Sequence, residues 1–69
     1  MNTYFLSFDF WSSDFNINKF FFGVVVIDLQ EKSLPDWCRK IIEDNFDFDN
    51  DEVSEFTIKV TCFNNVSID

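Results

Sequence analysis

Residues 33–46 read SLPDWCRKIIEDNF, and this stretch decides the class of fold. Apolar side chains recur along it at three- and four-residue intervals, which is the spacing of one face of an α-helix. The residues of this apolar stripe are Leu34, Trp37, Cys38, Ile41, Ile42 and Phe46. Ser33 is a favourable N-cap residue, and Pro35 suits the first helical turn. The pattern therefore predicts an amphipathic helix over residues 34–45.

Outward from this helix, three stretches have the character of β-strands. Residues 55–63 and 3–11 alternate between apolar and other side chains, which is typical of a strand with one buried face. The apolar positions are Phe56, Ile58, Val60 and Cys62 in the first stretch and Tyr4, Leu6, Phe8 and Phe10 in the second. Residues 20–29 are almost continuously apolar and rich in Phe, Val and Ile. That continuity predicts a strand covered on both faces. The strand of residues 55–63 could lie beside either of the other two, and the continuity favours a central position for residues 20–29.

The order of these elements is β-β-α-β, which predicts an α+β fold in a single compact domain of residues 1–69. We expect a three-stranded, mainly antiparallel sheet with one helix on one face. A polar connection over residues 12–19 favours an antiparallel hairpin between the first two strands. A right-handed crossover through the helix makes the second and third strands parallel. The helix should pack through its apolar stripe onto Phe56, Ile58 and Val60.

Aromatic residues make up 20% of the chain, which is more than one helix can cover. We expect Phe5, Trp11, Phe21 and the valines of residues 20–29 to leave the other sheet face apolar. An exposed apolar patch usually marks a protein interface. This face could meet a partner or a second copy stacked sheet to sheet. The alternative is a fuller core, with the polar connection or the C-terminal end folded over the sheet.

Residues 43–55 concentrate the negative charge of the protein. Seven of its 13 acids lie there without any Lys or Arg, whereas the rest of the chain holds six acids and five bases. Phe46 and Phe48 are interleaved with these acids. Such a segment is either a solvated loop that promotes solubility or a surface for a basic partner. The candidate partner-binding residues are Glu43, Asp44, Asp47, Phe48, Asp49, Asp51, Glu52 and Glu55.

The composition argues against several chemistries. The chain has no His and one Gly, so it lacks the usual general base, the commonest zinc ligand and a glycine-rich phosphate loop. Asp47, Asp49 and Asp51 match the start of a calcium loop, but Glu52 and Ile58 stand where Gly and a bidentate Glu are required. We expect no enzymatic activity, no cofactor and no metal. The net charge of −8 disfavours direct contact with nucleic acid or anionic membranes.

Cysteine usage and the N-terminus indicate a cytoplasmic protein. Cys38 and Cys62 form no CxxC motif, and the first residues lack the charged and apolar regions of a signal peptide. The longest apolar run, residues 20–27, is too short to cross a bilayer. We therefore expect reduced thiols and a cytoplasmic location, which is the host cytoplasm if the chain is encoded by a phage.

In size, charge and the stretch DNFDFDNDE at residues 44–52, the chain resembles small anti-defence inhibitors of phages and mobile elements, anti-CRISPR proteins among them. The resemblance is one of class, without an aligned motif, so no binding residue is transferred from it. It implies a non-catalytic inhibitor whose carboxylates stand where phosphates would lie in a basic nucleic-acid channel. Two alternatives are an immunity protein or antitoxin that neutralises a toxin, and an accessory subunit that oligomerises through the apolar sheet face.

Overall fold

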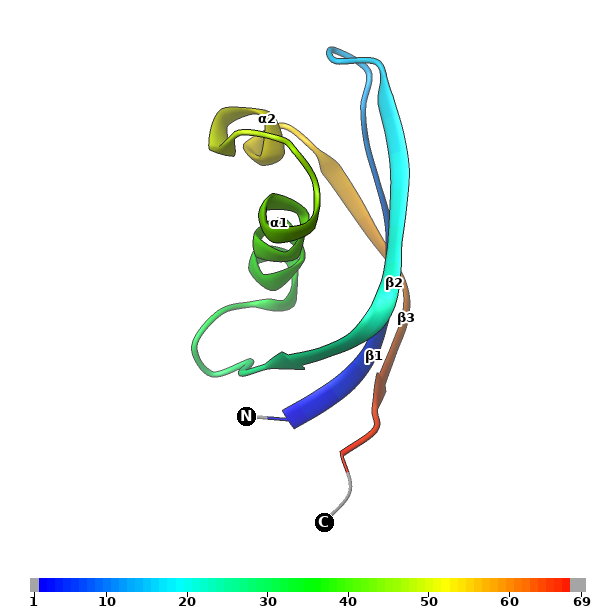
Figure 1. The fold of residues 1–69 in the computed structure, drawn as a ribbon, viewed down its shortest axis with the longest axis vertical. Helices are drawn as coiled ribbons and strands as arrows, with labels where there is room; N and C mark the ends of the chain where they lie inside the picture. The colour runs from blue at the N-terminus through cyan, green and yellow to red at the C-terminus, as the bar shows by residue number, and fades with distance from the viewer. Residues whose placement is uncertain (1, 68–69) are drawn as a thin grey trace.

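The computed structural model describes residues 2–67, which form one sheet with two helices on one of its faces (Figure 1). The elements are β1 (Asn2–Ser12), β2 (Ile17–Ile27), α1 (Leu34–Asn45), α2 (Asn50–Ser54) and β3 (Thr57–Asn65). The strand order is β2-β1-β3, and both neighbouring pairs are antiparallel. This confirms the α+β class and the antiparallel sheet. Strands β2 and β3 run in the same direction but lie on opposite sides of β1.

A tight hairpin joins β1 to β2. The two strands pair without interruption from Asn2 opposite Ile27 to Ser12 opposite Ile17. The chain reverses over residues 13–16, where Asn16 has a φ of 53° and donates its N–H to the Ser13 carbonyl at 3.3 Å. Asn tolerates this left-handed conformation better than most residues. The connection is therefore half the length expected from residues 12–19, because the polar residues after the turn continue the ladder.

The central strand is β1, so the expected central position of residues 20–29 is wrong. Leu6, Phe8 and Phe10 on β1 are fully buried beneath the helices. On β2 only the odd-numbered side chains face that core, whereas Phe22 is 65% exposed on the other face. The continuous apolar sequence of this strand therefore does not mean that both of its faces are buried. Phe21, expected on the open face, instead stacks on Phe8 in the core, with ring centroids 5.4 Å apart.

Helix α1 begins and ends where the sequence predicts. The Ser33 hydroxyl accepts a hydrogen bond from the Asp36 N–H at 3.4 Å, which confirms the N-cap. The buried residues of α1 are Trp37, Cys38, Ile41 and Ile42, as the apolar stripe predicts. On β3, Ile58 packs against the core that α1 covers, but Val60 is 37% exposed. Val60, nearer the exposed edge of the sheet, is therefore not part of the buried core beneath α1.

Candidate acidic binding surface

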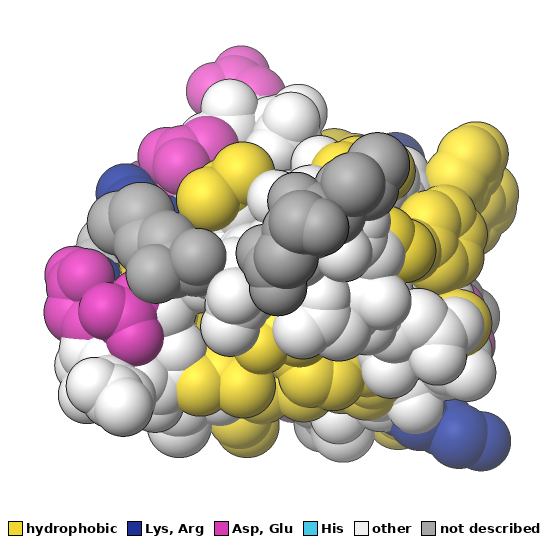
Figure 2. All heavy atoms as spheres, turned by 90° about the horizontal axis from the view of Figure 1, so that it is seen from below, with side chains coloured by type: hydrophobic (Ala, Val, Ile, Leu, Met, Phe, Trp, Pro, Cys, Tyr) yellow, Lys and Arg dark blue, Asp and Glu magenta, His cyan; other side chains and the backbone are white. Residues whose placement is uncertain are grey.

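The acidic segment, residues 43–55, is partly helical. It comprises the last turn of α1, a short link, the whole of α2 and Glu55, which is the C-cap residue of α2. Six of its seven acids are exposed, and Glu52 is half-buried. Figure 2 views the molecule from the end opposite α2; there too, acidic side chains lie on the side of the helices and protruding hydrophobic ones on the other side. The molecule thus presents two chemically different surfaces, one charged and one apolar.

The two phenylalanines of the acidic segment point into the protein. Phe46 and Phe48 pack edge-on against Phe10, with ring centroids 5.1 and 6.4 Å away. Phe48 also meets Phe56 edge-on at 5.1 Å. The alternation of acids and aromatics therefore separates an outer charged side from an inner apolar side. Of the predicted partner-binding residues, Phe48 serves chiefly to anchor the segment, because its half-buried ring packs on the core.

The sequence pattern predicts one helix, so α2 is an additional helix within the acidic segment. A reciprocal capping box starts it. The Asp49 carboxylate accepts a hydrogen bond from the Glu52 N–H at 2.9 Å, and the Asp49 N–H donates to the Glu52 carboxylate at 3.4 Å. Val53, one residue further on, is buried in the core. The D-x-x-E spacing followed by an apolar residue is the signal that predicts such a helix start.

The seven acids divide by what their side chains do within the fold. Asp49 and Glu52 form the capping box, and Asp44 lies 3.6 Å from the Lys40 ammonium one helical turn earlier. The remaining acids make no side-chain hydrogen bond or ion pair with residues 2–67; they are Glu43, Asp47, Asp51 and Glu55. These four carboxylates are exposed on a folded frame. They are the members of the predicted site whose carboxylates have no hydrogen-bond or ion-pair partner within residues 2–67, although Asp51 also lies in the first turn of α2.

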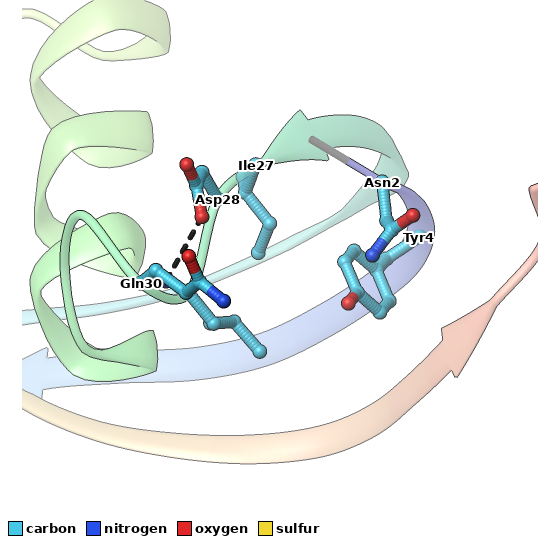
Figure 3. A pocket seen from close by; sticks show the side chains of 6 residues that line it. Asn2, Tyr4, Ile27, Asp28 and Gln30 are labelled. Atoms are coloured by element: carbon cyan, nitrogen blue, oxygen red, sulfur yellow. Dashed lines mark hydrogen bonds between the residues drawn. The ribbon is translucent and has the colours of Figure 1, made fainter.

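A shallow pocket opens at the other end of the sheet (Figure 3). Its volume is about 320 Å³, and its walls come from the start of β1 and the segment after β2. The lining residues are Asn2, Tyr4, Ile27, Asp28, Leu29 and Gln30. Asp28 supplies its single carboxylate, which accepts a hydrogen bond from the Gln30 N–H at 2.9 Å. The pocket therefore lacks the pair of carboxylates that acid–base chemistry of the glycosidase kind uses.

Residues 2–67 contain no group of three or more side chains placed to hold a metal ion. Both cysteines are free thiols. Burial raises the pKa of the Cys38 thiol to about 11, against a smaller opposing effect of the Arg39 charge. Cys38 is thus a packed thiol rather than a reactive thiolate near neutral pH.

The open face of the sheet is a second candidate surface, and it is apolar. The sequence predicted only some of its residues. Four exposed apolar side chains follow one another along β2: Phe20, Phe22, Val24 and Val26. Phe20 and Phe22 stack with ring centroids 5.9 Å apart. Trp11 and the half-buried Phe5 flank them on β1. The even-numbered positions of β2 form this stripe, so period-two counting through the apolar run would have found it.

Comparisons with known proteins indicate no function for the acidic segment or for the apolar open face. No protein-family model matches the chain, and no curated protein or solved structure matches it significantly. None of the helices in residues 2–67 is long and apolar enough to cross a membrane. A proposal for the function therefore rests on the charge and packing of the chain itself.

Proposed function

We propose that this protein is a non-catalytic inhibitor that binds a basic, nucleic-acid-binding surface of an effector complex through its acidic segment. The observation that carries the proposal is the set of four exposed carboxylates without a hydrogen bond or ion pair in residues 2–67, held on α1, on α2, on the link between them and at the C-cap of α2. Carboxylates in that setting mimic the backbone phosphates of a nucleic acid. The proposed mode of action is competition, in which the protein occupies the groove and excludes the nucleic acid.

Rigidity of the segment supports this proposal over a solvated loop. A loop that only promotes solubility has no need of aromatic anchors or a capping box. Here Phe46 and Phe48 fix the link against Phe10, and Asp49 fixes the start of α2. A charged surface that is ordered before binding loses less conformational entropy when it meets a partner. Complementary charge also steers the approach of a basic partner and increases the association rate.

The test begins with a tagged copy of the protein, which is used to capture its partners from a bacterial lysate. The captured proteins are identified by mass spectrometry. The binding affinity for a captured effector is then measured at several salt concentrations, with a short DNA or RNA duplex as competitor. We expect the affinity to fall with salt and the duplex to compete. An immunity protein or antitoxin would instead capture a toxin.

A matched pair of triple variants assigns the binding surface. Asp47→Asn, Asp51→Asn and Glu55→Gln remove three carboxylates from the acidic segment and leave the capping box intact. Asp14→Asn, Glu31→Gln and Asp36→Asn change the net charge equally at exposed positions outside it. The first triple variant should bind more weakly and with a shallower salt dependence, whereas the second should resemble the wild type. Equal binding by all three proteins would refute the proposed surface.

A further inference from the structure

The outer edge of β2 is the largest feature that the proposed function leaves unexplained. β2 has eleven residues and pairs with β1 along its whole length, so its other edge has no partner within residues 2–67. In Figure 1 this strand lies in front of β1 and β3, and the helices lie to one side of it. Unpaired N–H and C=O groups along such an edge are a template for another strand.

Sheet edges are usually protected, and the two edges of this sheet differ in that respect. The pairing of β3 with β1 shifts by one residue at Thr61, which lies opposite no residue of β1 in the register although its hydroxyl is hydrogen-bonded to that of Ser7. Such an irregularity bends an edge strand and hinders further pairing. β2 has no proline and no shift of register, and Lys19 is its single charged residue. A long, regular edge with a single charged residue is the kind that binds another strand.

We infer that the occupant of this edge is a second copy of the chain, paired β2 to β2 in the antiparallel direction. A two-fold axis beside β2 would join the two sheets into one of six strands. Pairing of all eleven residues of Ile17–Ile27 is possible in one register, which places Phe22 opposite its own copy. Phe20 then faces Val24 of the other copy on the open face. Cross-strand pairs of aromatic and β-branched residues stabilise a sheet.

Charge does not oppose a second copy at this edge, even though the protein is strongly acidic. In the full register Lys19 faces Val25 of the other copy, so no strand position sets two like charges against each other. The open face beside the edge is neutral: its charged residues on the strands are Asp9 and Lys59, which are cross-strand partners. Of the 12 acids within residues 2–67, none other than Asp9 lies on a strand. Two copies of this anionic protein can therefore pair at the β2 edge without bringing their carboxylates close together.

Edge pairing fits the shape of the sheet better than face-to-face stacking. The sheet bends around α1, so its open face is convex (Figure 1). Two convex faces touch over only part of their area, whereas curvature does not prevent strands from pairing at their edges. Eleven paired residues extend over roughly 37 Å. A single pair of strands is still a small interface, so we expect a weak, concentration-dependent dimer.

Sedimentation velocity over a wide range of protein concentration tests whether the dimer exists. The mass should rise from 8.3 kDa towards twice that value. Phe22→Lys sets two ammonium groups against each other at the two-fold axis and should weaken the dimer at least tenfold. Thr57→Lys adds the same charge on β3 and should leave the dimer unchanged. A monomer at every concentration would overturn the inference, as would equal effects of the two variants.

Cysteine cross-linking tests the geometry. In a Cys62→Ser background, Phe22→Cys should form an intermolecular disulfide, because opposed residues of paired strands have Cα atoms about 5 Å apart. Val26→Cys is the matched control, since its own copy would lie far along the strand. Sheets stacked face to face are about 10 Å apart, which is too far for a disulfide. A dimer that fails to cross-link at position 22, or that cross-links equally at position 26, would refute the proposed pairing.

Discussion

Asp49 and Glu52 cap each other at the start of α2, with the Asp49 carboxylate 2.9 Å from the Glu52 nitrogen and the Asp49 nitrogen 3.4 Å from the Glu52 carboxylate. This reciprocal pair orders a segment whose composition alone suggests a loop. Asp49 and Glu52 thus stabilise the fold, whereas other acids of the segment remain available to a partner.

The capping box yields the first prediction. Asp49→Ala should lower the free energy of unfolding by about 1 kcal/mol, because the Glu52 N–H loses its acceptor. Asp49→Asn keeps a good capping oxygen and should cost much less. Asp47→Ala, two residues earlier, removes an exposed carboxylate without a partner in residues 2–67 and should leave stability nearly unchanged. Urea denaturation followed by circular dichroism measures all three, and equal losses from Asp49→Ala and Asp47→Ala would contradict the role of the cap.

The two tryptophans should contribute very differently to stability. Trp37 is buried, and its indole N–H donates to the Asp28 carbonyl at 2.8 Å, which ties α1 to the segment after β2. Trp37→Ala should lower the free energy of unfolding by about 3–5 kcal/mol, a large share of what a small domain has. Trp11 is 37% exposed on the open face, so Trp11→Ala should cost clearly less. Chemical denaturation would contradict this ranking if the two variants were equally stable.

Much of the fold follows from local sequence patterns. The predictions that proved wrong are those in which one sequence pattern can have two physical causes. The limits of α1 were predicted because the apolar stripe, Ser33 and Pro35 all agree. The strand order was not, because continuous apolarity in β2 can mean burial on both faces or, as here, one buried face and one exposed stripe. The core position of Phe21 follows from the pairing of β2 with β1, which sets Phe21 opposite the buried Phe8.

The candidate surface was predictable in its charge but not in its architecture. Counting acids along residues 43–55 finds the exposed carboxylates directly. The inward orientation of Phe48 depends on Phe10 and Phe56, which come from distant strands or their flanks and meet only in the fold. The start of α2 was readable from the Asp49 and Glu52 spacing, but the density of like charges favoured a loop. Local charge and tertiary packing therefore have to be weighed together.

The thiols give a prediction with a defined pH dependence. The pKa of Cys38 rises from 9.0 to about 11 in the folded state, chiefly through burial. A raised pKa favours the protonated form in the folded protein, so its stabilising effect is complete below pH 9 and is lost as the pH rises through about 11. Stability should therefore decline over this range, and less steeply in Cys38→Ala. Ellman's reagent at pH 8 should label the half-buried Cys62 first and Cys38 only on unfolding; equally fast labelling would contradict the packing of Cys38.

Calcium should leave the thermal stability unchanged. Asp47, Asp49 and Asp51 have the spacing of the first ligands of a calcium loop, but Asp49 is engaged in the capping box with Glu52. A specific ion site would stabilise the fold by mass action and raise the melting temperature with ion concentration. The measurement is a thermal melt with millimolar calcium or with a chelator, and magnesium serves as the control. A rise of several degrees with calcium alone would reveal a site.

Mutual repulsion within the acidic segment leads to the last prediction. Seven acids in thirteen positions repel one another, and at most surface distances this repulsion is screened by salt, since the Debye length falls to about 10 Å at 0.1 M ionic strength. The melting temperature should therefore rise with added sodium chloride. Neutralising Asp47, Asp51 and Glu55 together should raise it at low salt and reduce its response to salt.

The triple variant Asp14→Asn, Glu31→Gln and Asp36→Asn provides the comparison, because it changes the net charge by the same amount at positions spread along the chain. Repulsion between close charges exceeds repulsion between distant ones, so this variant should keep most of the wild-type salt response. Thermal melts from low to high salt measure the difference. Identical responses of the two triple variants would show that net charge, rather than its concentration in residues 43–55, governs stability. In that case the acids of the segment would act as a diffuse charge instead of a focused surface, which would also weaken the case for a basic groove as their partner.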